Sequence, residues 1–132
     1  MPVVLDTCAW IWMCSDQARL SPAAREVISK QRDRDGLVVP VIACWEVAKL
    51  VQKGKLAFRM RVDEWIERAT HFPGVRVHPL TPRICVESTQ LPGDFHGDPA
   101  DQIIVATARE IEASILTPDR RIRDYPHVGT IW

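Results

Sequence analysis

The sequence predicts an α/β fold in which a central, mostly parallel sheet is flanked by helices. Short runs of β-branched and apolar residues alternate along the chain with segments of helical periodicity. This alternation is typical of parallel sheets, because a helix usually makes the crossover between parallel strands. A length of 132 residues and a hydrophobic content of 46% are sufficient for one core without disulfides. We therefore expect one domain over residues 1–132.

The first half of the chain is predicted to contain two strands, each followed by a helix. Apolar residues 3–5 form the first strand, and the helix after it begins near Cys8. A further helix opens at Ser21-Pro22, where a capping hydroxyl precedes proline at the first helical position. Residues 37–42 form the second strand, and the helix 44–53 that follows it ends at Gly54, a residue typical of helix C-termini.

The second half continues the same alternation. Apolar residues repeat at helical spacing between Phe58 and His71, which predicts an amphipathic helix there. A strand at 75–77 precedes a helix that is opened by Thr81-Pro82. After a surface loop at 91–97, a long helix covers residues 99–113 and leads into a strand at 114–117.

Composition excludes several classes of protein. The 17 basic and 17 acidic residues balance, so the chain is not a strongly basic nucleic-acid-coating protein. No run approaches the roughly 18 apolar residues of a membrane span, and the first residues lack the order of a signal peptide. We expect a cytoplasmic protein with no membrane association. The cysteines form no CxxC pair, which predicts buried, reduced thiols at Cys8, Cys14, Cys44 and Cys85.

Four acidic side chains are predicted to meet at one rim of the sheet. Asp6 follows the first strand, Glu46 comes shortly after the second, and Asp119 follows the last strand by one proline. Asp101 joins them from the start of the helix 99–113. Ligands of open α/β sheets bind outside the carboxyl ends of the strands, where these acids lie. Each pair of carboxylates at 4 Å repels by about 4 kcal/mol at an effective dielectric of about 20, so either some are protonated or a cation lies among them.

An all-oxygen donor set favours a hard cation. Mg²⁺ typically takes one or two carboxylates together with water and substrate phosphate oxygens. The sequence contains no Gly-rich phosphate loop and no Walker lysine, which argues against a nucleotide triphosphatase. The acids therefore favour metal-dependent phosphodiester chemistry.

A structural role also remains open for each acid. These roles are N-caps for Asp6 and Asp98, a favourable helix-dipole position for Asp101, an ion pair with Lys49 for Glu46, and a turn with Pro118 for Asp119.

Four segments of the sequence resemble the PIN domain, in particular the VapC-like toxins of bacterial type II toxin–antitoxin pairs. They are VLDT at 4–7, WEVA at 45–48, LPGDFHGDPADQIIVATA at 91–108 and TPDRRI at 117–122. The likeness runs in order over nearly the whole chain, and the third segment is its most specific part. The resemblance implies a PIN-like three-layer sandwich.

The resemblance also implies a Mg²⁺-dependent endoribonuclease, in which Mn²⁺ can substitute. Its catalytic acids are Asp6, Glu46, Asp101 and Asp119, with Asp6 and Asp101 as the expected metal ligands. Supporting positions are Thr7, Asp98 and Thr117, and candidate substrate contacts are His96, Arg120 and Arg121. Three positions depart from the common family pattern without removing an acid, and they are Cys8, Ala43 and Gln102.

The partners that the resemblance implies are a VapB-like antitoxin, an RNA substrate and a second copy of the chain. Two other functions are compatible with acids at strand ends. A receiver or HAD-type phosphotransfer domain needs a second Asp beside Asp6 and a lysine near the last strand, but no lysine follows Lys55. The alternative from another class is a catalytically silent PIN scaffold that binds a partner protein or RNA.

Overall fold

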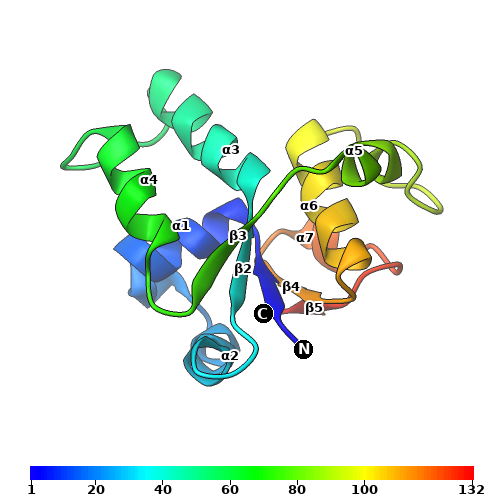
Figure 1. Cartoon of the computed structure of the whole chain (residues 1–132), viewed down its shortest axis with the longest axis horizontal. Helices are drawn as coiled ribbons and strands as arrows, with labels where there is room; N and C mark the ends of the chain where they lie inside the picture. Colours follow the sequence, from blue (N-terminus) through cyan, green and yellow to red (C-terminus); the bar gives the residue numbers. More distant parts are fainter.

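A computed structural model describes residues 1–132 and contains one five-stranded sheet between two groups of helices (Figure 1). The strands are β1 (Val3–Leu5), β2 (Leu37–Pro40), β3 (Val75–His78), β4 (Ser114–Leu116) and β5 (Thr130–Ile131). Their order is β3-β2-β1-β4-β5, and every neighbouring pair is parallel. The predicted α/β sandwich with a parallel sheet is confirmed.

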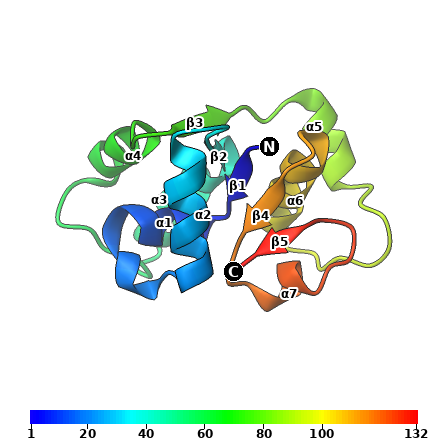
Figure 2. The same cartoon turned by 90° about the horizontal axis from the view of Figure 1, so that it is seen from below.

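Helices cover both faces of the sheet, which produces three layers (Figure 2). One group comprises α1 (Thr7–Ser15), α2 (Pro22–Arg32), α3 (Val41–Gln52) and α4 (Val62–Thr70), with the 3-10 turn Gln17–Arg19 between α1 and α2. The other group comprises α5 (Pro82–Ser88), α6 (Pro99–Glu110) and α7 (Arg120–Arg123). The helices α3 and α6 contact each other across the two groups.

The core lies on both faces of the sheet. Val3 and Leu5 of β1 pack with Trp10 in a cluster under the first helical group. Val4, between them in sequence, packs with Ile104 of α6 in a second cluster. Successive side chains of a strand point to opposite faces, so a central strand that is covered on both sides has to be apolar throughout.

Helix capping follows the predicted pattern. Ser21 and Thr81 accept hydrogen bonds from the backbone N–H groups of Ala24 and Ile84 at 3.0 and 3.1 Å. Gly54 follows α3 with a φ of +71°, a conformation in which glycine has no steric penalty. These local signals determine where three of the helices begin or end.

Some element boundaries differ from the sequence prediction. Residues 41 and 42 belong to α3 and not to the second strand, because β2 ends at Pro40, which has no N–H to extend the ladder. The helix α6 ends at Glu110 and not at 113, and β4 ends at Leu116. The strand β5 was not predicted, since two residues are too few to show a period.

The predicted burial of the cysteines is wrong. All four are free thiols as expected, but Cys8 and Cys85 are exposed, and Cys14 and Cys44 are half-buried. In α1 the buried side chains include Ala9, Trp10 and Met13, and Cys8 lies outside that face. None of the helices combines the length and the apolar character that crossing a bilayer requires.

Candidate active site

The strand order reverses between β1 and β4, and the predicted acids lie at this position. β2 and β3 extend the sheet on one side of β1, whereas β4 and β5 extend it on the other. The chain segments that leave β1 and β4 therefore diverge and open a crevice at the carboxyl end of the sheet. Asp6 follows β1 directly, and Thr117 and Asp119 follow β4.

Asp6 is the most enclosed of these acids, with 5% of its surface exposed. Its Oδ1 accepts a hydrogen bond from the Ala9 N–H at 2.8 Å, so the predicted cap of the first helix is present. Its Oδ2 accepts a hydrogen bond from the hydroxyl of Thr117. Burial raises the pKa of Asp6 to about 7, and the two hydrogen bonds only partly oppose this. Asp6 thus caps α1 and is also a carboxylate whose charged form is disfavoured by burial.

Three acids lie close enough together to share one cation. Glu46, Asp98 and Asp101 place carboxylate oxygens within 4.8 Å of one another. We call these three residues the acid cluster. Asp98 occupies this place because it is the N-cap of α6, where its Oδ1 accepts from the Asp101 N–H at 3.0 Å. Asp6 and Asp119 are not in the acid cluster, although both act on its charge.

Burial and repulsion by neighbouring acids disfavour the charged forms of Asp101 and Glu46. Burial raises the pKa of Asp101 to about 7, and Asp98 and Glu46 add to the rise. The pKa of Glu46 is also raised, and burial is the largest cause. The hydrogen bond that Glu46 accepts from the Thr7 hydroxyl acts in the opposite direction. A half-buried set of carboxylate oxygens fits a hard divalent cation, which would restore the charged forms of Asp101 and Glu46.

The ion pair considered for Glu46 does not form. Lys49 instead donates from its Nζ to Gln52 Oε1 at 2.7 Å. The carboxylate of Glu46 is directed toward Thr7 and the acid cluster, because it lies on the side of α3 that faces α6.

His96 lies against the acids and is not simply an exposed loop residue. Its Nδ1 accepts a hydrogen bond from the Asp98 N–H at 3.3 Å, which assigns the ring hydrogen of the neutral form to Nε2. Nε2 lies 3.2 Å from Asp101 Oδ2. The loop at 91–97 therefore places the imidazole beside the acid cluster, where its buried Nε2 has no hydrogen-bond partner.

The two arginines predicted to contact the substrate differ in their surroundings. Arg121 Nη2 lies 3.5 Å from Asp101 Oδ2 and 3.6 Å from Asp119 Oδ2. Arg120, its neighbour in α7, is exposed and forms no ion pair with an acid. Asp119 begins α7 by accepting from the Arg121 N–H at 2.8 Å, so its predicted turn role is in fact an N-cap.

The three departures from the family pattern have separate surroundings. Ala43 is fully buried in the core under α3. Gln102 Nε2 donates to the His96 carbonyl at 3.0 Å and so supports the loop that carries the imidazole. Although part of the Cys8 residue is exposed, desolvation of its thiol and the neighbouring acids raise the pKa of that thiol to about 12, which keeps it neutral.

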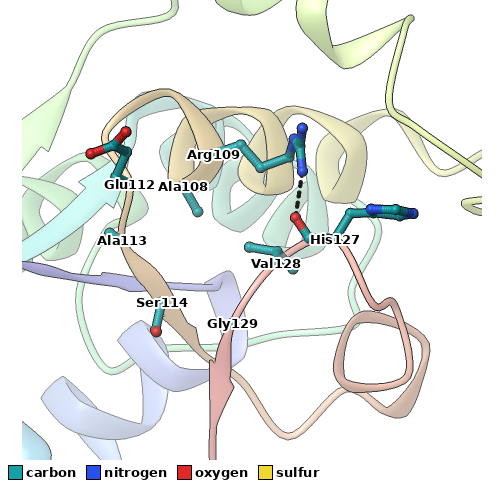
Figure 3. Close-up of a pocket in the computed structure, with 8 residues that line it drawn as sticks. All are labelled: Ala108, Arg109, Glu112, Ala113, Ser114, His127, Val128 and Gly129. Atoms are coloured by element: carbon teal, nitrogen blue, oxygen red, sulfur yellow. Dashed lines mark hydrogen bonds between the residues drawn. The ribbon is translucent and has the colours of Figure 1, made fainter.

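Two hollows of similar size lie at different ends of the molecule. One of about 340 Å³ adjoins the acid cluster and is lined by Glu46, Asp98, Trp45 and three lysines. The other, of about 330 Å³, lies at the start of β4, away from the strand end that carries the acids. Figure 3 shows Arg109 in the second hollow, where it donates a hydrogen bond to the backbone carbonyl of His127.

The lysines beside the acid cluster were missed in the sequence. From the sequence, Lys49 is expected only as an ion-pair partner of Glu46, and neither Lys53 nor Lys55 is expected near the acids. The available signal was their density, because three of the four lysines of the chain lie within residues 49–55.

Comparison with known proteins identifies one protein family that matches the chain. The PIN domain model matches residues 3–128. Ribonuclease VapC22 of Mycobacterium tuberculosis is 33% identical over 132 residues, which is 98% of this chain and 98% of that protein.

Solved structures with a similar fold come from toxin–antitoxin assemblies. VapBC2 from Rickettsia felis, bound to a DNA fragment from its promoter, has a TM-score of 0.74 and 12% identity over 98% of this chain and 97% of that chain. VapBC-1 from nontypeable Haemophilus influenzae has a TM-score of 0.68 and 21% identity over 98% and 96%. A toxin–antitoxin complex from Klebsiella pneumoniae has a TM-score of 0.63 and 15% identity over 97% and 96%. At these identities the likeness shows the fold.

Proposed function

Because the chain belongs to the PIN domain family, we propose that it is the VapC-type toxin of a toxin–antitoxin pair and acts as a Mg²⁺-dependent endoribonuclease. The observation that carries this proposal is the acid cluster beside the buried Asp6, at the point where the strand order reverses. The relative VapC22 is named a ribonuclease, and this supports RNA hydrolysis as the reaction class.

Asp6 and Asp101 are the proposed metal ligands, and Glu46 and Asp98 place further carboxylate oxygens within 4.8 Å of that of Asp101. When bound, Mg²⁺ or Mn²⁺ supplies a water molecule of lowered pKa and positive charge against the phosphoryl oxygens. Oxygen donors that repel one another in its absence are suited to such an ion. No covalent nucleophile is required.

The residues around the ligands hold them and meet the substrate. Thr117 and Thr7 donate hydrogen bonds to Asp6 and Glu46, which holds those carboxylates in place. Asp119 accepts a proton or a hydrogen bond from the attacking water. Arg121 has 60% of its side chain exposed, so it can contact an RNA phosphate while it lies beside Asp101.

The proposed partners are an RNA substrate, a VapB-like antitoxin and a second copy of the chain in the cytoplasm, with residues 1–132 acting as one PIN domain. Similarity to the structures of VapBC complexes supports an antitoxin as a binding partner. Exposed apolar side chains support the dimer, because a second copy would remove them from water. They lie on α3, on and after β3, and on α5, and are Val41, Val77, Leu80 and Val86.

The test is RNA cleavage by the purified, antitoxin-free protein. Total cellular RNA is incubated with Mg²⁺, Mn²⁺ or EDTA, and new ends are mapped for the wild type, Asp6→Asn and Asp101→Asn. Asp94→Asn is the matched control, because Asp94 is an exposed acid in the nearby loop. Discrete cuts that require metal and disappear only in the first two variants are expected. A folded protein that cuts under no condition would favour the catalytically silent PIN scaffold instead.

A further inference from the structure

We propose that the hollow between α3 and the start of α6 is a binding subsite for a nucleotide of single-stranded RNA. In this subsite Trp45 stacks on a base, and Lys49, Lys53 and Lys55 contact the backbone phosphates. We call these four residues the lysine–tryptophan subsite. The inference rests on the proposed ribonuclease function, and it assigns RNA contacts to residues outside the acid cluster.

The position of the hollow connects it to the acids. Its volume is about 340 Å³, and one wall comes from α3 and the turn after it. The opposite wall is the start of α6, from Asp98 to Ala100. Glu46 and Asp98 line the hollow and also belong to the acid cluster, so the two sites are continuous. An RNA strand with one phosphate at the acids therefore extends into this hollow.

The end of α3 gathers the three lysines. Lys49 and Lys53 are four residues apart and so share one side of the helix. Gly54 then reverses the chain with a φ of +71°, and the N–H of Lys55 bonds the Leu50 carbonyl at 2.9 Å. This glycine-dependent helix end returns Lys55 to the side that Lys49 occupies.

None of these lysines is neutralised by a carboxylate. No Asp or Glu lies within ion-pair distance of Lys49, Lys53 or Lys55, whereas Lys30, the remaining lysine, pairs with Glu26 at 2.9 Å. The three ammonium groups outnumber the carboxylates of Glu46 and Asp98 in the same lining, so the lysine side of the hollow attracts an anion, and the phosphates of RNA present a series of them. This local positive charge also offsets the repulsion between RNA and the nearby acids, which the zero net charge of the chain does not.

Trp45 supplies the second element that single-stranded RNA recognition requires. It is 55% exposed and precedes Lys49 by one helical turn, whereas Trp10 and Trp65 are buried in the core. Sequence-tolerant binding of single strands combines a positive groove with aromatic faces on which bases stack. An acidic segment of a partner protein would pair with the lysines but has no base to stack on the indole. RNA is therefore the occupant that both features favour.

The test measures RNA binding without cleavage. The full chain in EDTA is titrated into a fluorescently labelled single-stranded RNA of about eight nucleotides, and anisotropy is followed at several salt concentrations. Lys53→Gln combined with Lys55→Gln is expected to weaken binding and to reduce the slope of log K against log salt by about 1.4, from about 0.7 for each lost contact. Trp45→Ala is expected to weaken binding by roughly tenfold with the slope unchanged, and Trp45→Phe is expected to recover most of the loss.

Lys30→Gln is the matched control, because it removes a lysine from α2 without altering the subsite, and it is expected to bind RNA like the wild type. The inference is overturned if the wild type binds no RNA, or if the double lysine variant and Trp45→Ala bind RNA like Lys30→Gln. It is also overturned if these variants lose affinity for an acidic peptide and not for RNA. Cleavage plays no part in this measurement. A chain that binds RNA through the subsite but never cuts it would refute only the proposed ribonuclease.

Discussion

The hydroxyl of Thr117 donates a hydrogen bond to Asp6 Oδ2 and so connects the ends of β4 and β1 across 111 positions of the sequence. The parallel register causes this contact, because Leu5 and Leu116 are opposite each other and the next residues leave the sheet side by side. Both side chains are buried. The hydrogen bond is therefore a fixed part of the site and not a surface contact.

Thr117→Val is expected to lower the free energy of unfolding by about 1–3 kcal/mol, because it leaves a buried carboxylate with one hydrogen bond fewer. The loss should be larger at pH 8 than at pH 5, since the hydrogen bond lowers the pKa of Asp6 and its removal raises that pKa further. Urea unfolding at the two pH values measures both effects. Thr107→Val is the matched control, because Thr107 is also buried but donates to the Ile103 carbonyl within α6. The same pH dependence in both variants would contradict the prediction.

The metal-free protein is expected to become less stable between about pH 4 and pH 7. The pKa of Asp6 is raised from 3.8 to about 7, so in this interval the folded chain holds the proton more tightly than the unfolded chain. Protonation thus favours folding, and its contribution is lost as the pH rises. Asp6→Asn removes this loss and keeps an acceptor for the Ala9 N–H. Unfolding in EDTA should show the variant more stable above pH 7, by up to about 4 kcal/mol, and nearly equal to the wild type at pH 4.

Added Mg²⁺ is expected to reverse that order above pH 7, because only the wild type retains all the carboxylates of the proposed metal site. The exposed Asp94 again provides the control, and Asp94→Asn should follow the wild type at every pH. Parallel stability curves for the wild type and Asp6→Asn would show that the burial of Asp6 has no energetic effect.

The two roles of Asp98 can be separated by two substitutions. Asp98→Ala removes both the cap and the carboxylate, whereas Asp98→Ser keeps a capping oxygen for the Asp101 N–H. The Ala variant should be less stable than the Ser variant by about 1 kcal/mol. Both should show a smaller rise in melting temperature with Mn²⁺ than the wild type. A full rise in the Ser variant would show that Asp98 is only a cap.

Arg121→Gln is expected to shift the pH dependence of Mn²⁺ affinity to higher pH. Arg121 lowers the pKa of Asp101, so its removal raises that pKa and a higher pH is needed to ionise the carboxylate. Calorimetric titration with Mn²⁺ between pH 6 and 8.5 measures the displacement. Arg120→Gln, in the same helix but without an acid partner, should leave the profile in place. Equal displacement in the two variants would point to net charge instead of the contact with Asp101.

The sequence predicted the strands β1 to β4 and the helix starts at Ser21 and Thr81, because these depend on short-range rules of burial and capping. It did not predict which cysteines are exposed, because exposure depends on which side of each helix meets the sheet. The same limit applies to His96. The sequence names His96 only as a candidate substrate contact, and its place 3.2 Å from Asp101 depends on how the loop packs against α6.

Sequence alone determined the fold class and the parallel sheet, because a helix between consecutive strands favours a parallel crossover, and it placed Asp6 and Asp119 after strands because that position is read directly along the chain. Tertiary structure decided which acids are neighbours. Asp98 joins Glu46 and Asp101 only because α3 packs against the start of α6. The same packing places three unpaired lysines and Trp45 around a hollow beside those acids. Distances between side chains on different elements follow from packing, which no segment of the sequence contains by itself.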